Sequence, residues 1–377
     1  MFRWARELRG RTIDDVAKHF KKTSSQINDW ETGKKTPTLN QAQSLADFYN
    51  RHLLEFYLNI PPIIPTPKSI PDFRTYAKTP SLSENWEIQH EWKWAEAQRL
   101  NALDLFEELR EEPPEIPGEL FSSLKMNPEG VADAFRAHLN FSIQEQVTLS
   151  NNIALPQLIR KKLESAGILT IKQSHLTQIG VRGMCIALLP LPVIVFGKES
   201  PAAQAFTIAH ELGHILIKES GISGHMKRNV DNDIERWCNR FSAAFLMPRI
   251  QVLNLAGAPP VIPAPSIDNE ALAKLAKSFC VSSHAMLIRL IDLGYVLDSY
   301  YWDIKKPEFD AIEQDYRSFG RAKYYGSRYK SSLGDLYTGL VIDAWTSGKI
   351  TNHNAAEYMG IKNLTHLNAI RDALTSQ

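Results

Sequence analysis

The stretch 207-TIAHELGHIL-216 decides how the rest of the chain is interpreted. It lies in an apolar, helix-periodic segment that begins near Pro201, a residue suited to the first turn of a helix. In a helix, His210 and His214 lie one turn apart on the same face, so two imidazoles can bind one zinc ion. Glu211 flanks them without being a natural ligand, and it can act as a general base toward an attacking water. Alone the motif is only suggestive, because a chain with 11 histidines can contain this spacing by chance.

A second predicted helix, 230-VDNDIERWCNRFSAAFLMP-248, supplies a third ligand. Its polar stripe includes Glu235, which can complete a site of two histidines and one glutamate. Asn239 follows one turn later and can orient a ring N–H of either histidine. Asp233 is the main alternative carboxylate, but it falls on a different side of the helix and is better explained as a cap. His225 could stabilise an oxyanion, although an exposed loop histidine is the simpler interpretation.

Residues 1–58 are predicted to form a compact unit of four to five helices. Three of the helices are expected to begin at the caps Thr12, Ser24 and Thr38. Only 21-KKT-23 separates the second helix from the third, which is the spacing of a helix-turn-helix. The sequence therefore predicts a helix-turn-helix domain at this end of the chain.

Charge gives little help in identifying a partner. The whole chain has 43 Lys and Arg against 42 Asp and Glu, so no nucleic-acid, membrane or acidic partner is implied globally. Residues 1–60 contain ten basic and seven acidic residues, a small excess for a domain that binds phosphates. A helical docking module therefore stays open as the alternative to DNA binding.

The remaining boundaries follow from composition and periodicity. Residues 59–75 are Pro-rich and are expected to form an extended linker. Residues 76–250 are predicted to form the domain that holds the histidine motif, with a small sheet built from 167-GILTIKQSH-175, 180-GVRGMCIALL-189 and 192-PVIVFG-197. Residues 251–302 are interpreted as a helical scaffold resembling a helix-turn-helix, and residues 303–377 as a helical extension. The predicted fold class is α+β, mostly helical.

Localisation is inferred from what the sequence lacks. No apolar run reaches the length of a membrane span, and the start of the chain has no secretory pattern. Three widely separated cysteines form no CxxC pair, which favours reduced, buried thiols. We therefore expect a cytoplasmic protein with no membrane partner.

The stretch 29-DWETGKKTPTLNQAQSLADFY-49 resembles the Cro/CI-type (Xre) helix-turn-helix family, in which a Trp-Glu-x-Gly segment closes the recognition helix. The resemblance covers about 55 residues and implies binding to double-stranded DNA. It also implies that four polar residues face the bases and two lysines lie near phosphates. These residues are Ser24, Ser25, Gln26 and Asn28, followed by Lys34 and Lys35.

Five segments together resemble the ImmA/IrrE family of metallopeptidases: RTYAKTPSLS, VRGMCIAL, FTIAHELGHIL, ERWCNRFSAAFLMP and LAKSFCVSSHAMLIRLIDLGYV. The resemblance implies a gluzincin-like zinc peptidase with Zn²⁺ held by His210, His214 and Glu235, and with Glu211 as base. Cys238 departs from the small Ala that usually precedes the family's Asn, a conservative change.

Two classes of function follow from these resemblances. The first is a zinc-dependent endopeptidase fused to a DNA-binding domain, which cleaves a partner repressor or antitoxin. The alternative is a transcriptional regulator or antitoxin-like protein, in which the metallopeptidase fold serves as a sensor or an interaction module.

Overall fold

The computed structural model describes residues 1–49, 51–62, 82–149, 151, 153–223, 233–314, 324–361 and 363–375. Most of the predicted linker, from residue 63 onward, lies outside these residues. The described chain divides into two compact units. The N-terminal unit contains residues 1–62 and 82–93, and the second unit contains the residues from 94 onward. Helix α5 (Leu82–Leu109) begins in the first unit and ends in the second.

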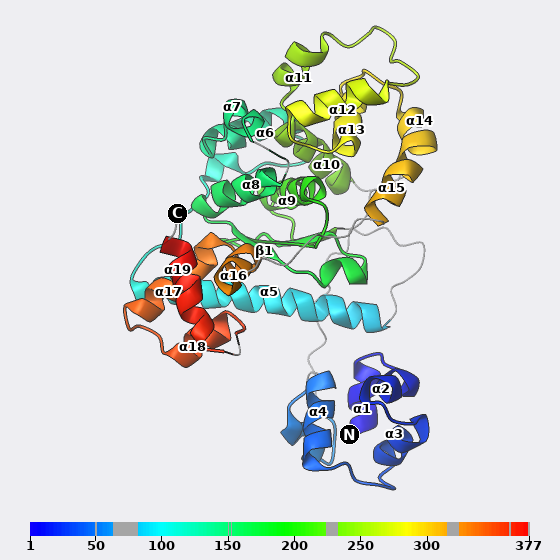
Figure 1. Cartoon of the computed structure of the whole chain (residues 1–377), viewed down its shortest axis with the longest axis vertical. Coiled ribbons are helices and arrows are strands. Elements are labelled where there is room, and N and C mark those ends of the chain that lie inside the picture. Colours follow the sequence, from blue (N-terminus) through cyan, green and yellow to red (C-terminus); the bar gives the residue numbers. More distant parts are fainter. Residues whose placement is uncertain are drawn as a thin grey trace. The chain divides into compact units, whose positions relative to one another are not determined.

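The N-terminal unit contains four helices and one 3-10 turn before α5 (Figure 1): α1 (Phe2–Leu8), α2 (Ile13–Phe20), α3 (Ser24–Glu31), α4 (Leu39–Tyr49) and η1 (Leu53–Tyr57). Its small core is built around Val16, Ile27 and Leu45, which are almost completely buried. Arg6 on α1 binds Glu31 at the end of α3 through two contacts of 2.6 and 3.0 Å. The Glu of the Trp-Glu-x-Gly segment therefore ties these two helices together.

The cap predicted for α3 was wrong by one residue. Thr23, not Ser24, is the N-cap, and Ser24 is the first helical residue. The Thr23 side chain accepts a hydrogen bond from the backbone N–H of Gln26, and the Gln26 side chain accepts one from the backbone N–H of Thr23. This is a capping box, in which each partner satisfies a donor that the helix leaves unpaired. The predicted cap Thr12 is confirmed, with Asp15 as its partner.

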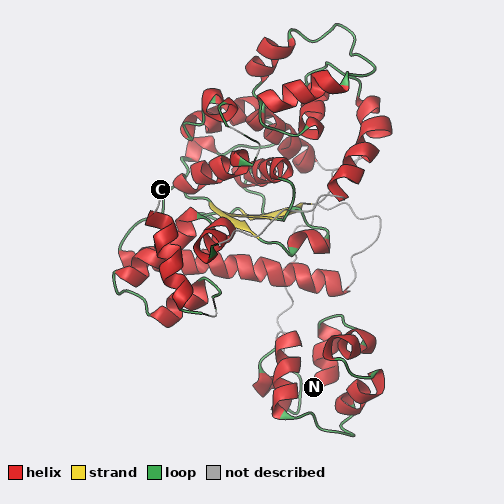
Figure 2. Cartoon of the chain, in the orientation of Figure 1, coloured by secondary structure: helices red, strands yellow, loops and turns green. Residues whose placement is uncertain are grey.

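A four-stranded sheet lies at the centre of the second unit (Figure 2): β1 (Leu169–Lys172), β2 (Gly183–Ile186), β3 (Val193–Phe196) and β4 (Gly221–Ser223). The strand order is β1-β3-β2-β4. β1 is parallel to β3, whereas β2 is antiparallel to both β3 and β4. The three predicted strands are confirmed, but β4 was not predicted, because its three residues follow a helix and show no alternation.

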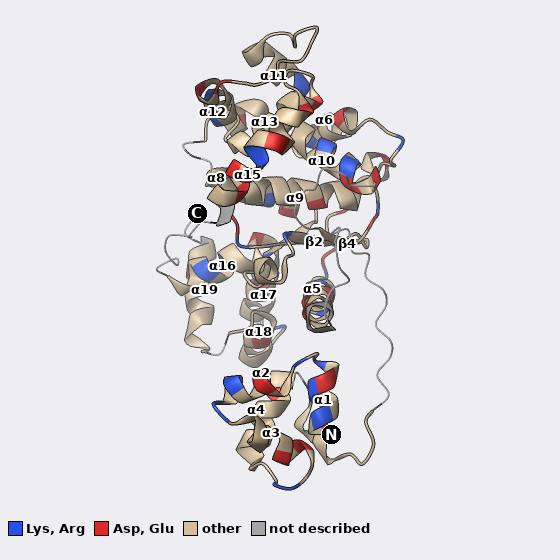
Figure 3. Cartoon of the chain, turned by 90° about the vertical axis from the view of Figure 1, so that its right-hand side faces the viewer, with Lys and Arg blue, Asp and Glu red and all other residues tan. Residues whose placement is uncertain are grey.

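Helices cover both sides of this sheet. α8 (Ala154–Ser165) and α9 (Pro201–Leu216) pack on one face, and the second half of α5 runs along the other side (Figures 1 and 3). α10 (Asp233–Leu246) packs on α9, and α6 (Pro128–His138) packs on α10. The second unit also contains three short helical elements: η2 (Gly118–Leu120), α7 (Ile143–Val147) and η3 (Leu176–Ile179). The apolar residues of α9 and α10 therefore share one core with the sheet.

The remaining regular elements among the described residues are helices. The first group follows α10 and comprises α11 (Arg249–Ala256), α12 (Asn269–Ser278), α13 (Ser283–Asp292), α14 (Asp298–Tyr300), the π-helical turn η4 (Tyr301–Lys305) and α15 (Lys306–Gln314). The last group is α16 (Tyr325–Leu333), α17 (Asp335–Thr346), α18 (Asn352–Tyr358) and α19 (Thr365–Thr375). The predicted fold class, mostly helical with a small sheet, is confirmed. Among the described helices, none is long and apolar enough to cross a bilayer.

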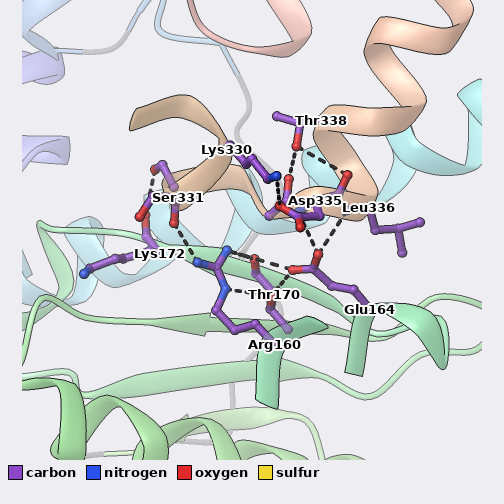
Figure 4. Close-up of polar contacts among 11 residues, drawn as sticks. Arg160, Glu164, Thr170, Lys172, Lys330, Ser331, Asp335, Leu336 and Thr338 are labelled. Carbon is purple, nitrogen blue, oxygen red and sulfur yellow. Dashed lines mark hydrogen bonds and ion pairs between the residues drawn. The ribbon is translucent and has the colours of Figure 1, made fainter. Parts of the chain in front are cut away.

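A buried polar cluster attaches the last group of helices to β1 (Figure 4). Arg160 on α8 donates from Nε to Thr170 Oγ1 at 3.0 Å and from Nη2 to the Thr170 carbonyl at 2.8 Å. Its Nη1 donates to the carbonyl of Ser331, on α16, at 2.7 Å. The guanidinium therefore joins α8, the sheet and the C-terminal helices.

Glu164, one turn further along α8, completes this cluster. Its Oε2 accepts the backbone N–H groups of Asp335 and Leu336 at 2.6 and 3.0 Å, so the carboxylate caps the start of α17. Its Oε1 accepts the hydroxyl of Thr170. The preceding Gly334 has a φ of +85°, and a Cβ there would lie 2.9 Å from the Thr170 carbonyl oxygen. Only glycine fits this approach of α17 to the strand.

Candidate functional site

The histidine motif lies in the second half of α9, which begins at Pro201 behind the N-cap Ser200, and His214 is in the last turn. Almost the whole helix is buried, so it runs through the interior of the second unit. His210 and His214 keep only 7% and 1% of their surface exposed. Two imidazoles this deeply buried need polar partners, because burial of an unpaired polar group is costly.

Gly213 lets α10 come close enough to supply such a partner. A Cβ at this position would lie 3.2 Å from Phe241 Cδ1 and 3.3 Å from both Cα and Sγ of Cys238. The two helices therefore lie close together here, and a larger residue at this position would push its neighbours on α10 by a few tenths of an ångström. This close crossing places Glu235, in the first turn of α10, opposite the two histidines.

The three predicted ligand residues converge at one point. His214 Nε2 lies 3.0 Å from Glu235 Oε1 and 3.2 Å from His210 Nε2. His210 Nε2 lies 3.3 Å from Glu235 Oε2. Tetrahedral zinc with bonds of about 2.0–2.1 Å holds its ligand atoms about 3.3–3.4 Å apart. The donor set and its spacing therefore fit a divalent zinc ion.

The protonation of this cluster also fits a cation. Two Nε2 atoms 3.2 Å apart cannot both carry a proton without their N–H groups pointing at each other. Burial raises the pKa of Glu235, but the two histidines outweigh it, and the pKa falls to about 2. Burial lowers the pKa of His214. The site therefore combines an ionised carboxylate with at least one imidazole lone pair that faces it, which is an arrangement that a metal ion stabilises.

Glu211 is completely buried beside this cluster. Neither of its carboxylate oxygens has a hydrogen-bonding partner among the described residues. Burial raises its pKa to about 8, and the charge of Glu235 adds to this effect, while His210 opposes it. A buried carboxyl group of this kind is costly for folding, and such perturbed groups are concentrated at functional sites.

The other candidates near the motif fall in different places. Burial lowers the pKa of His210, but Glu235 outweighs this and the pKa rises, with a smaller contribution from the partly buried Asn239. Asp233 forms an ion pair with Arg236, and its side chain is 76% exposed, so it lies away from the ligands. His225 lies outside the described residues. Ser223 was not predicted, but its Oγ lies 3.5 Å from His214 Nε2, because β4 runs past the site.

Comparison with known proteins finds matches in both parts of the chain. Residues 164–290 match the model of the IrrE N-terminal-like domain, and residues 2–56 match a helix-turn-helix model. The chain joins a helix-turn-helix domain to an IrrE-like domain. It is also 25% identical over 191 residues to the radiation response metalloprotease IrrE of Deinococcus radiodurans. That match covers 44% of this chain and 56% of the relative, so the chain spans about half of the relative's length.

The predicted DNA-contacting residues lie on and just after α3. Ser24, Ser25 and Gln26 are exposed and Asn28 is partly buried. Ser24 Oγ donates to Asp14 at 2.5 Å, and the Gln26 side chain is occupied by the capping box. Half of this set therefore already has partners within the domain.

The two lysines after α3 differ in their surroundings. Lys34 and Lys35 are both exposed. Lys35 Nζ lies 3.2 Å from Asp29 Oδ2, a carboxylate on α3 itself. Part of the positive charge expected to face phosphate is therefore neutralised locally.

Proposed function

We propose that this chain is a zinc-dependent endopeptidase fused to a DNA-binding domain, and that its substrate is a partner repressor or antitoxin protein. The observation that supports the proposal most is the convergence of His210, His214 and Glu235 next to the unpaired carboxyl group of Glu211. The IrrE-like domain adds support from an independent source.

Each residue has a separate task in the proposed reaction. His210, His214 and Glu235 would hold the zinc ion, and Asn239, one turn after Glu235, would orient an imidazole ring. When bound, the ion polarises the scissile carbonyl and increases the acidity of water. Glu211 accepts the proton of the attacking water on its carboxylate and delivers it to the leaving amine. Burial of Glu211 favours this role, because a carboxyl with a raised pKa both accepts and releases a proton near neutral pH.

The N-terminal domain is proposed to bind double-stranded DNA through α3. Ser25 and the free amide end of Gln26 are accessible on this helix, and Lys34 is positioned to approach a phosphate. This arrangement would place a peptidase at the operator that its substrate occupies.

The alternative function is a regulator that has kept the metal centre as a sensor or an interaction module. The small excess of basic residues and the local Asp29–Lys35 pair leave room for a domain that docks protein instead of DNA. The two functions differ in whether Glu211 is needed.

The change Glu211→Gln tests the choice directly. Glutamine keeps the shape of the side chain but cannot accept the proton, so turnover of the partner should fall by about 10²- to 10⁴-fold. The experiment compares the partner's half-life and the operator occupancy in strains with wild-type protein, Glu211→Gln and the exposed control Glu219→Gln. Equal half-lives in all three strains with normal regulation would reject the peptidase and favour the sensor.

A further inference from the structure

The first residue of β2 is Gly183, and its backbone conformation does not require a glycine. It does not adopt a positive φ, so any residue could take its conformation. It pairs with Phe196 of β3 on one side and with Ser223 of β4 on the other. Glycine weakens a strand with neighbours on both sides, and it is found there mainly where another group approaches closely.

That approaching group is the carboxyl end of Glu211. A Cβ at position 183 would lie 2.9 Å from Glu211 Cδ and nearer still to Oε1. It would also lie 2.8 Å from Thr207 Cγ2. Ordinary contacts of a Cβ begin at about 3.4 Å, so an alanine would be too close to both groups, and each contact needs a shift to relieve it.

Thr207 is held more firmly than Glu211. Its hydroxyl donates to Glu199 Oε2 at 2.8 Å, and Glu199 is in turn paired with Arg182, next to Gly183 in the sequence. The rotamer of Thr207 is therefore fixed, because its side chain is β-branched and its hydroxyl is hydrogen bonded to Glu199. Among the described residues, no hydrogen bond fixes the carboxylate of Glu211, so it is the group that would be displaced further.

We propose that Gly183 is a positioning residue for Glu211: its missing side chain creates the space in which the carboxyl group lies against β2. The effect of Gly183 on catalysis rests on the proposed function. The packing of Glu211 against Gly183 does not, because this space exists whether or not the protein cleaves a peptide.

The first test uses stability and needs no activity. Gly183→Ala should shift the folding equilibrium toward the unfolded state by about 10- to 100-fold, as overpacking does. In a Glu211→Ala background the obstructing carboxyl group is gone, so the shift should become clearly smaller, and the part that remains comes from the contact with Thr207. Glu219→Ala, a change at an exposed glutamate beyond the end of α9, should leave the shift intact.

A third background separates the two neighbours of Gly183. Thr207→Ser removes the methyl group but keeps the hydroxyl that binds Glu199. If Thr207→Ser abolishes the effect of Gly183→Ala and Glu211→Ala does not, Gly183 is a spacer for the helix and the proposal is overturned. An equal shift in all backgrounds would overturn it too.

The second test uses metal and turnover together. Gly183→Ala should bind Zn²⁺ within about threefold of the wild-type affinity, because the three ligands are untouched. Its kcat on the partner should fall about 100-fold with little change in KM, as expected when a catalytic group is misplaced by about 1 Å. Normal kcat in Gly183→Ala would contradict the proposal. If the wild type itself cleaves nothing, the proposed function fails, while the stability cycle still decides the role of Gly183.

Discussion

The second unit contains two buried glutamates in opposite situations. Glu164 accepts hydrogen bonds from the Thr170 hydroxyl and two backbone N–H groups, and it lies 3.9 Å from Arg160. Glu211 is at least as deeply buried, yet no hydrogen bond reaches its oxygens among the described residues. Packing of the fold accounts for the buried carboxylate of Glu164. The buried carboxyl group of Glu211 is accounted for only by a functional role.

The difference separates buried polar groups that stabilise the fold from buried polar groups that serve a function. A buried charge whose partners all come from the chain fixes the arrangement of helices and strands, as Glu164 does for α17. A buried carboxyl group without such partners makes the folded state less stable, and it is retained where chemistry needs it. Substitutions at Glu164 and Glu211 test this contrast directly, and substitutions at the metal centre and after α3 show where charge serves binding instead.

The largest effect on stability is expected for Glu164→Ala. The change leaves Arg160 buried without its carboxylate and frees two N–H groups of α17, so unfolding should become easier by about 3–5 kcal/mol. Urea titration followed by circular dichroism measures this loss. A loss below about 1 kcal/mol would show that the cluster does not hold the C-terminal helices.

A smaller effect is expected at the metal centre. Glu235→Gln removes the charged ligand and should weaken Zn²⁺ binding about 10- to 100-fold, measured by competition with a chelator. Asp233→Asn, on the exposed side of the same helix, is the matched control and should bind normally. Unchanged affinity in Glu235→Gln would remove this residue from the ligand set.

DNA binding should respond less strongly still. Lys34→Ala should weaken binding to all sequences and reduce the slope of log affinity against log salt by about 1, as the loss of one phosphate contact does. Lys35→Ala should have a smaller effect, because Asp29 already neutralises much of its charge. Equal effects of the two changes, in a fluorescence anisotropy titration, would show that the ion pair opens on DNA.

The smallest effect on stability is expected for Glu211→Gln. In the metal-free protein at pH 7, a carboxyl group with a pKa of about 8 is mostly protonated, so glutamine replaces it with similar shape and charge. The free energy of unfolding should change by no more than about 1 kcal/mol, or about 2–4 °C in Tm. A loss as large as that of Glu164→Ala would mean that Glu211 also has a structural role.

The sequence predicted three of the four described strands and the three converging side chains, because both depend on local spacing. An i, i+4 pair fixes two histidines on one helical face, and a polar stripe on an otherwise apolar helix singles out Glu235. The cap at Thr23 could have been found too, since 23-TSSQ-26 has the pattern of a capping box.

The features that the sequence did not predict depend on contacts between segments that are far apart in the chain. Nothing near Gly183 in the sequence reveals that Glu211 lies against it, and nothing in Gly213 reveals how closely α10 crosses α9. β4 is too short to show a pattern, so Ser223 could not be placed beside His214. Glu164 and Arg160 have the spacing of an ordinary helical ion pair, and only the structure shows that they reach α16 and α17.

The cluster around Arg160 has a consequence for any shortened form of the protein. The carbonyls of Thr170 and Lys172 point away from β3, and they accept hydrogen bonds from Arg160 and from Ser332 on α16. Without α16, β1 would become an open edge strand with carbonyls available to another molecule, and such edges lead to aggregation. A chain truncated before Tyr325 should therefore precipitate or form oligomers, even though every residue of the metal centre would still be present.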